Sequence, residues 1–563
     1  MLNNILHESN YLRYKVIFEE HPYKDFSSSA TIHFFDENDK VASVLKLGVI
    51  SEEEIFRRIE NNEILNLNQA YISNFSLSEY RIKKGLNETE PVILNNFSAK
   101  KAFFDCELIT DFSYADFSGE TTNFEGCIFG NNAVTFANAR FLGDDVIFKN
   151  SKFGTGSVSF QSVGMGKGLV CFNKVNFGKG NLNFVDANFG HGNVDFKNAI
   201  FGEGIVDFKF AKFLTGEISF ERCNFSKGKK DFKNVEFGDG KIDFRRIEFN
   251  DGDVSFEGTE FGNGKINFRG SSFGDGFISF EQSHFGQSDV HFELVKFGTG
   301  SISFNKAQAN NISFAGCSLN CYMDLRFKKC NLINLSNTIL RDILDLMHED
   351  EKVHINTLDL SGMRNLGKIF IHWRSNNVRS LIYNQTENSY FKKSEQFRIL
   401  KENFRNNGQY DDEDKAYIQF KRCESKANLE LGIERGGIEA IMGYINYYFQ
   451  KYFFDFIGRY ATDPTRVFIN MLIAIITFGL GFYSLTNFFP EFGSIATTIG
   501  DSPLNHYNEF GNAFYFSAIT FFTIGYGDYF AEGFMKPLAA FEGFTGVFLM
   551  SYFTVAFVRK TLR

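Results

Sequence analysis

The feature that most constrains this chain is a phenylalanine that returns at every twelfth position, without exception, from Phe112 to Phe304. A second series runs five positions behind it, from Phe117 to Phe297, with Met165 in place of one phenylalanine. The chain holds 72 Phe and 50 Gly against 6 Pro and 1 Trp, a bias that an ordinary globular domain does not show. The period and the bias together indicate a repeat array.

Within each repeat, apolar residues alternate with polar ones. The position two before a first-series Phe is mostly Val, Ile or Leu, as at Val158 and Ile218. The position two before a second-series Phe is mostly small, as at Ala187 and Ser271. Because residues i and i−2 share one face of a strand, both positions point inward and the polar residues between them face water. The repeat therefore predicts a solenoid of short strands.

The inward Phe with a small residue two positions earlier resembles the pentapeptide-repeat family, and this resemblance implies a right-handed, four-sided β-helix. That family advances in steps of five, whereas here steps of five and seven alternate, so one coil could take up either one repeat or two. We favour two repeats, or twenty-four positions, because a coil of one repeat would have a perimeter of only about 40 Å and little room for two stacked Phe rings. The range 112–304 would then form about eight coils.

Glycines follow many second-series phenylalanines in an FGxG pattern, as at Gly178 and Gly180 or Gly262 and Gly264. We expect these glycines to form corners that need a positive φ. A calcium-binding repeat is the alternative, but it has a period of nine and requires Asp at fixed corner positions. The residue between the glycines varies here, so the sequence favours structural corners.

Composition and periodicity divide the chain into five expected domains. They are an α/β cap at 1–100, a pentapeptide-repeat-like β-helix at 101–390, a helical hairpin linker at 391–436, an interfacial amphipathic helix at 437–462 and a two-span pore domain at 463–563. The cap is expected to cover the first open edge of the β-helix. Strand-like apolar runs extend the β-helix to about Ile382, and the second hairpin helix starts with an acidic turn at Asp411.

Two apolar segments near the C-terminus, 464–485 and 537–558, are each long enough to cross about 30 Å of hydrocarbon at about 1.5 Å per residue. A short helix at 510–522 is expected to enter the bilayer between them. The flanking basic residues are Arg459, Arg466, Arg559, Lys560 and Arg563. This distribution predicts that both termini are cytoplasmic, as does the lack of a basic, apolar leader in the first residues.

The residues between the short helix and the second span carry the functional signal. They are Thr523, Ile524, Gly525, Tyr526, Gly527 and Asp528. A cation that loses its water needs replacement oxygens, and consecutive carbonyls can supply them if the backbone dihedrals alternate in hand. Glycine permits that backbone, so we expect the carbonyls of residues 523–526 and the Thr523 hydroxyl to bind the cation. Ile524 and Tyr526 should point away from the axis and pack on the supporting helix, while Asp528 holds the outer mouth.

The segment TFFTIGYGDYF resembles the selectivity filter of the potassium-channel pore family, and the resemblance covers roughly the C-terminal sixth of the chain. It implies a homotetramer in a lipid bilayer, with permeant K⁺ and no other cofactor. The whole arrangement is similar to prokaryotic pentapeptide-repeat proteins with an attached pore unit. That similarity implies the inner (plasma) membrane of a bacterium.

The sequence leaves two roles possible for several residues in the second span and near the pore. Gly543 and Gly546 could form a gating hinge or allow close helix packing, and the sequence does not choose between the two. Glu542 and His506 could report pH, but solvation at the rim of the pore is the interpretation we favour.

The sequence thus predicts a tetrameric potassium channel whose β-helix acts as a sensor, a tether or an assembly platform. An unknown ligand or protein is a candidate partner for the surface of the β-helix. The alternative is a binding scaffold, such as a DNA mimic or a protein-interaction rod, with a vestigial or non-selective pore. A net charge of −9 argues against binding nucleic acid, and no catalytic motif points to an enzyme. The 8 cysteines lack the spacing of a zinc site and are expected to be packed thiols.

Overall fold

The computed structural model describes residues 13–36, 38–347, 354–498 and 509–562. The chain forms two compact units, Met1–Thr386 and Glu387–Arg563. The first is built largely from strands and the second largely from helices, and each is described by itself below.

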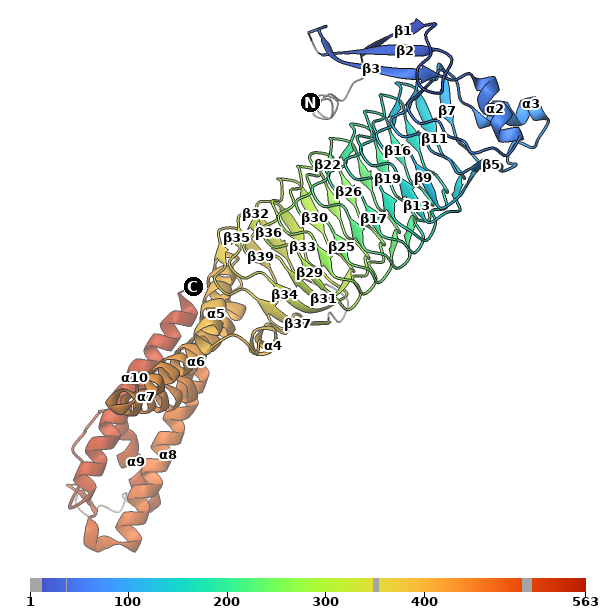
Figure 1. The fold of residues 1–563 in the computed structure, drawn as a ribbon. Coiled ribbons are helices and arrows are strands. Elements are labelled where there is room, and N and C mark those ends of the chain that lie inside the picture. Colours follow the sequence, from blue (N-terminus) through green and yellow to red (C-terminus); the bar gives the residue numbers. More distant parts are fainter. Residues whose placement is uncertain (1–12, 37, 348–353, 499–508, 563) are drawn as a thin grey trace. The chain divides into compact units, whose positions relative to one another are not determined.

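The first unit is a parallel β-solenoid (Figure 1). Among the described residues, its two long sheets contain 12 and 11 strands. The first sheet contains β7 (Ile109–Asp111), β11 (Ala133–Thr135), β14 (Val158–Ser159), β16 (Leu182–Asn183), β19 (Val206–Asp207), β23 (Lys230–Asp231), β26 (Val254–Ser255), β28 (Ile278–Ser279), β30 (Ser301–Ser303), β33 (Tyr322–Asp324), β36 (Ile343–Asp345) and β39 (Lys368–Phe370). The second contains β9 (Thr121–Asn123), β13 (Asp145–Ile147), β15 (Val170–Cys171), β17 (Val194–Asp195), β21 (Ile218–Ser219), β25 (Ile242–Asp243), β27 (Ile266–Asn267), β29 (Asp289–His291), β31 (Gln308–Ser313), β34 (Lys329–Asn334) and β37 (His354–Asp359).

The strand register confirms that one coil takes up two repeats. Val146 of β13 pairs with Val170 of β15, and Val158 of β14 pairs with Leu182 of β16. Each partner thus lies two repeats further along the chain. Strands one repeat apart belong to different sheets, so one coil contains one strand of each. The remaining sides carry short pairs, including β18 (Ile200–Phe201) with β22 (Asn224–Phe225) and β20 (Lys212–Phe213) with β24 (Glu236–Phe237).

The phenylalanine series forms the core of the solenoid. Phe136 lies parallel to Phe160, one coil away, with ring centroids 4.8 Å apart and an interplanar angle of 2°. Phe136 meets Phe148 of the opposite side edge to face, at 5.4 Å and 89°. All three side chains are fully buried. Each sheet thus contributes a stack of parallel rings, and the two stacks meet at right angles, a geometry that suits the ring quadrupoles.

The expectation that the FGxG glycines need a positive φ was wrong for most of them. Gly178 and Gly262 have φ of +72° and +61°, but Gly180 and Gly264 do not lie in that region. The recurrent positive φ falls instead two positions after a first-series Phe, as at Asn138. The reason for glycine is close stacking, because a Cβ on Gly180 would lie 2.1 Å from the carbonyl oxygen one coil earlier.

The last coils are irregular. Ile312 pairs with Ile333 and Ile333 pairs with Leu358, so one coil is shorter and the next is longer than the regular turn. The strands expected to reach Ile382 stop earlier, because β39 ends at Phe370 and residues 378–383 form the helix α4 (Val378–Tyr383). α4 packs against β37 and buries Ile382, so an apolar helix covers the final coil instead of another strand.

The N-terminal part continues the solenoid into an antiparallel edge. β1 (Tyr14–Glu19), β2 (Ser29–Phe35) and β3 (Val41–Val49) are antiparallel, and β3 pairs in parallel with β4 (Ala70–Ile72). β4 then pairs with β6 (Phe103–Phe104), and β6 with β10 (Ile128–Phe129) of the repeat region. The helices α2 (Glu52–Glu60) and α3 (Leu77–Lys84) complete this part.

The second unit is a set of helices (Figure 1). They are α5 (Tyr390–Asn406), α6 (Tyr410–Arg435), α7 (Gly437–Phe449), the π-helix η1 (Gln450–Phe456), α8 (Pro464–Phe488), α9 (Glu509–Phe521) and α10 (Met535–Thr561). α5 and α6 form a hairpin, and α9 packs against both α8 and α10. Among the described helices, α8 and α10 are long and apolar enough to cross a membrane.

α7 and η1 together present apolar side chains to the outside of this unit. No side chain of either helix is buried. The exposed large apolar residues are Ile438, Ile441, Met442, Tyr444, Ile445, Tyr448, Phe449, Tyr452, Phe453 and Phe456. A surface of this kind is typical of a membrane interface or of a contact with another chain.

Candidate functional site

The segment that follows α9 has an alternating backbone. Thr523, Gly525 and Gly527 have φ of +53°, +58° and +79°, whereas φ is not positive at Ile524 and Tyr526 between them. A Cβ built on Gly525 or Gly527 meets nothing within 4 Å. Glycine is therefore favoured at these two positions by the left-handed backbone and not by a lack of space.

The outer end of the segment is anchored to two neighbouring elements. β41 (Tyr529–Ala531) pairs antiparallel with β40 (Ile495–Thr497). Thr498 donates from its hydroxyl to the carbonyl oxygen of Gly527 at 3.2 Å. Tyr515 of α9 donates to the Asp528 carboxylate at 2.8 Å. The Asp528 side chain thus connects the exit of the segment to the helix that precedes it.

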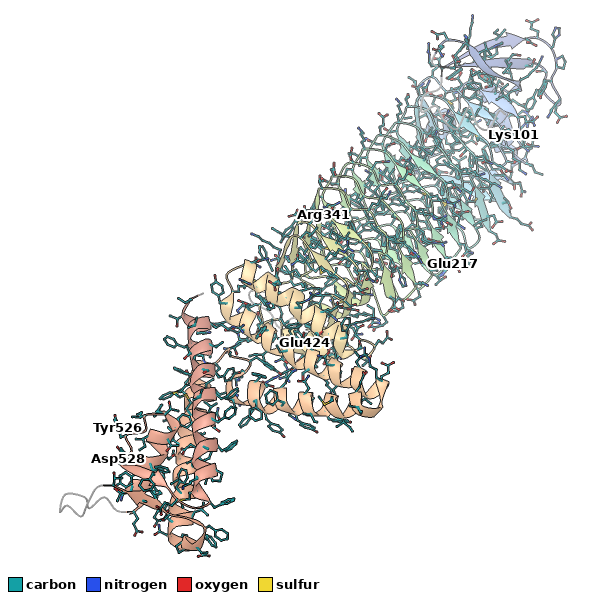
Figure 2. All side chains as sticks on the ribbon, turned by 90° about the vertical axis from the view of Figure 1, so that its left-hand side faces the viewer. Lys101, Glu217, Arg341, Glu424, Tyr526 and Asp528 are labelled. Atoms are coloured by element: carbon teal, nitrogen blue, oxygen red, sulfur yellow. The ribbon has the colours of Figure 1, made fainter. Side chains whose placement is uncertain are left out.

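The side chains of the segment are open on their outer side. Ile524 is 49% exposed and Tyr526 is 70% exposed, so the expected packing on the supporting helix does not occur within one chain. Both side chains are accessible to a neighbouring molecule. The Thr523 hydroxyl donates to the carbonyl oxygen of Phe522 at 2.7 Å, and its oxygen lone pairs remain able to accept. Tyr526 and Asp528 lie far from Glu424 of α6 within this unit (Figure 2).

α9 is held from behind by a buried polar contact. Ser517 donates to the carbonyl oxygen of Ile475 on α8 at 2.9 Å, and its hydroxyl also contacts the carboxyl group of Glu542 on α10. Glu542 is fully buried, so the expectation of rim solvation was wrong for this residue. The reason is that α10 packs the face that carries Glu542 against α9. His506 lies outside the described residues.

The two glycines of α10 have different surroundings. A Cβ on Gly546 would lie 1.9 Å from the carbonyl oxygen of Phe521, the last residue of α9. A Cβ on Gly543 would lie 3.8 Å from the carbonyl oxygen of Thr520, which is an ordinary contact. Close approach to α9 therefore explains the glycine at 546. A hinge at either position stays a prediction.

The end of α10 is bound to the helical linker. Arg559 donates to Asp414 of α6 at 3.2 Å, and its guanidinium lies 4.2 Å from the ring centroid of Tyr417. Lys560 donates to Asp411 at 3.0 Å. Tyr552, two turns earlier on the same helix, donates to the carbonyl oxygen of Phe454 at 2.8 Å. α10 is thus tied to both α6 and η1.

Sequence reasoning did not find these contacts. In the sequence alone, the acidic start of α6 predicts a helix cap, and the basic end of α10 predicts the membrane orientation. The two segments lie far apart in the chain, and nothing in a single sequence pairs them. The complementary charges at Asp414 and Arg559 were the available signal, and many other pairs of opposite charge compete with it.

The part of the chain that contains this site matches a protein family. Residues 470–563 match the model of a family described as Ion channel. The match begins within α8 and includes α9, the segment 523–528 and α10. No curated protein and no solved structure matched the chain. Residues 470–563 therefore form an ion channel domain, in a chain whose first unit is a β-solenoid.

Proposed function

We propose that this chain forms a tetrameric, potassium-selective channel whose filter is residues 523–528. K⁺ would bind the carbonyl oxygens of Thr523, Ile524, Gly525 and Tyr526 and the hydroxyl of Thr523. The observation that carries the proposal is the alternating φ at residues 523, 525 and 527, directly after α9 and within the region that matches the ion channel family. Alternating dihedrals turn successive carbonyl groups toward one side of the chain. Their oxygens can then replace the water molecules that surround a cation.

A single chain supplies only one row of such oxygens. Surrounding a cation requires several rows, and a closed ring of identical subunits is the simplest way to provide them. The exposed side chains of Ile524 and Tyr526 support this view, because they offer a neighbouring subunit an apolar surface next to the segment. α10 also exposes Phe541 and Phe544, which would face another subunit or lipid.

The charges flanking the spans support an orientation. Arg459 precedes α8, Arg466 lies in its first turn, and Arg559 and Lys560 lie at the end of α10. The positive-inside rule then places both ends of the pore domain, and the solenoid with them, in the cytoplasm. α7 and η1 would lie along the inner leaflet with their apolar side chains in the interface. The plasma membrane of a bacterium is the location we propose.

The solenoid would serve as a sensor, tether or assembly platform for the pore. The contacts that support a sensing role are those of Arg559 and Lys560 with α6, because α10 would line the inner part of the pore. A displacement of the linker would then reach the pore through these ion pairs. No enzyme activity and no cofactor other than the permeant ion is part of this proposal.

Reversal potentials in a planar bilayer test the function. With purified full-length protein and a tenfold K⁺ gradient balanced by Na⁺, the current should reverse close to about 59 mV in magnitude. Reversal near zero would contradict potassium selectivity. Native mass spectrometry of the same sample should show four chains. No flux at all would favour the alternative, a binding scaffold with a vestigial pore.

A further inference from the structure

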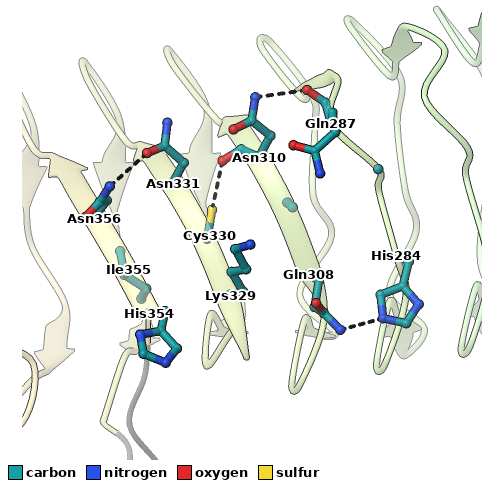
Figure 3. A pocket seen from close by; sticks show the side chains of 12 residues that line it. His284, Gln287, Gln308, Asn310, Lys329, Cys330, Asn331, His354, Ile355 and Asn356 are labelled. Atoms are coloured by element: carbon teal, nitrogen blue, oxygen red, sulfur yellow. Dashed lines mark hydrogen bonds between the residues drawn. The ribbon is translucent and has the colours of Figure 1, made fainter.

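The first unit contains a hollow of about 490 Å³ at the place where the coil length changes. On this side of the solenoid, β31, β34 and β37 are each 6 residues long, whereas the earlier strands β17 and β29 of the same sheet have 2 and 3. The shorter coil omits the corner that the regular repeat would place here, and the longer strands form the wall of the hollow (Figure 3).

Four polar side chains form a row along this hollow, one on each coil (Figure 3). His284 is in register with Gln308, Gln308 with Lys329, and Lys329 with His354. Adjacent parallel strands are about 4.8 Å apart, so neighbouring members of the row can contact the same small molecule.

Two members of the row already have partners. His284 contacts Glu260 through Nδ1 at 2.6 Å and Gln308 through Nε2 at 2.5 Å. Lys329 and His354 differ from them, because neither makes an ion pair or a side-chain hydrogen bond among the described residues. Some lysines of the regular coils face a carboxylate one coil away, as Lys212 faces Glu236 at 2.9 Å. The ammonium and the imidazole are therefore available for a ligand.

The remaining lining favours a negatively charged ligand. No Asp or Glu is among the described residues that line the hollow, although the chain has a net charge of −9. Amide side chains surround the row instead, and hydrogen bonds fix them. Asn356 donates to Asn331 at 3.2 Å, and Asn310 donates to the carbonyl oxygen of Gln287 at 2.9 Å. Fixed amides beside an unpaired ammonium are suited to an oxyanion.

We propose that this hollow binds a small organic anion whose phosphate or carboxylate group lies on Lys329 and His354. The neutral part of the ligand would lie along Asn331, Asn356 and Ile355. Binding would give the solenoid a ligand for the sensing role, and only that consequence rests on the proposed channel function. The binding itself depends on residues of the first unit alone.

Isothermal titration of the full-length protein in detergent tests the site. The probes are inorganic phosphate, ATP and citrate, each at constant ionic strength, and at least one should bind saturably with one site per chain. Lys329→Met should weaken that binding by about tenfold, since it removes a charged hydrogen bond. His354→Gln should weaken it less. The control is Lys296→Met, which removes another exposed lysine of the solenoid that makes no ion pair in the described structure and does not line the hollow.

The outcomes separate this site from the channel. No saturable binding of any of the three probes, or an equal loss of affinity in the Lys296→Met control, would overturn the site. Unchanged unfolding temperatures of the variants would show that a loss of affinity is not a loss of fold. Binding without any current would refute the channel and leave the site standing. Potassium currents without binding would refute the site alone.

Discussion

Arg559, near the end of α10, donates a hydrogen bond from Nη2 to Oδ1 of Asp414 on α6 at 3.2 Å. The Asp414 side chain is 9% exposed and that of Arg559 is 23% exposed, so this ion pair is largely shielded from water. Water screens such a pair less than it screens a pair at the surface. The contact connects the start of α6 to the end of α10.

Reversing one charge of this pair should change channel opening. Arg559→Asp or Asp414→Arg alone leaves a like-charge contact, and a cost of about 2 kcal/mol corresponds to about a thirtyfold shift in the opening equilibrium. The double exchange should restore most of the wild-type open probability. Single-channel recording in bilayers measures this.

A surface pair provides the control for that exchange. Arg435 and Glu439 contact at 3.1 Å, but their side chains are 58% and 60% exposed. Arg435→Asp should leave open probability nearly unchanged, because exposed pairs contribute little. Equal effects of Arg435→Asp and Arg559→Asp would argue against a specific role of the buried pair.

Gly546→Ala should abolish or strongly reduce current. Its Cβ would lie 1.9 Å from the carbonyl oxygen of Phe521, so α10 and α9 would have to move apart next to the proposed filter. Gly543→Ala is the matched variant, since its Cβ has room, and it should conduct almost normally. If Gly543→Ala instead suppressed opening while Gly546→Ala did not, a hinge at 543 would explain the glycines better than packing does.

Gly525→Ala or Gly527→Ala should eliminate selective K⁺ flux and leave the solenoid folded. An L-residue at φ of +58° or +79° costs about 1–2 kcal/mol, and the backbone relaxes toward a conformation that turns its carbonyl away. Potassium-dependent liposome flux and thermal unfolding by circular dichroism measure the two effects. Gly481→Ala in α8, where a Cβ meets nothing within 4 Å, should keep normal flux. Full selectivity in either filter variant would refute the filter assignment.

Phe256→Ala should destabilise the solenoid by about 3–5 kcal/mol, since it opens a cavity in the ring stack. Phe256 is fully buried, and its ring centroid lies 4.8 Å from that of Phe232 and 4.9 Å from that of Phe280. Phe210 is 48% exposed, and Phe210→Ala should change stability very little. Chemical denaturation, monitored by near-ultraviolet circular dichroism, compares the stability of the two variants. Similar losses in both variants would contradict the stacked core.

Lys230 should make the stability of the solenoid depend on pH. Its side chain is buried and donates to the carbonyl oxygen of Asp251 at 2.6 Å, and burial lowers its pKa to about 8. The unfolded chain keeps the ordinary pKa of about 10.4, so it binds more protons than the folded chain between these two pH values. Stability should therefore rise with pH across this window, by up to about 3 kcal/mol.

Lys230→Met isolates this contribution. The variant should lose only part of the rise in unfolding temperature between about pH 8 and about pH 10, because burial also lowers the pKa of Lys152 to about 8. Lys227→Met, which removes an exposed lysine, should retain the full rise. Thermal unfolding monitored across that pH range makes the comparison. A Lys230→Met curve parallel to that of the wild type would mean that the buried ammonium is not the source.

Local sequence patterns predicted the strands and helices correctly where residues a few positions apart determine them. The alternation before each Phe predicted inward-facing strands, because a strand turns successive side chains to opposite faces. The helical periodicity within 391–436 predicted a hairpin that is present as α5 and α6. The positive φ expected at the FGxG glycines was wrong for most of them. Glycine is required there because a carbonyl group one coil away leaves no room for a Cβ.

By itself, the sequence determined the period of the repeat, the inward face of each strand, the two apolar helices and the position of the TIGYGD segment. The sequence also favoured two repeats per coil, and the strand register confirmed this. Only the tertiary structure decided that Glu542 is buried against Ser517 and that Arg559 meets Asp414. The physical reason is the range of the interactions. Backbone geometry couples residues a few positions apart, whereas helix docking depends on how distant surfaces fit, and one sequence records no such pairing.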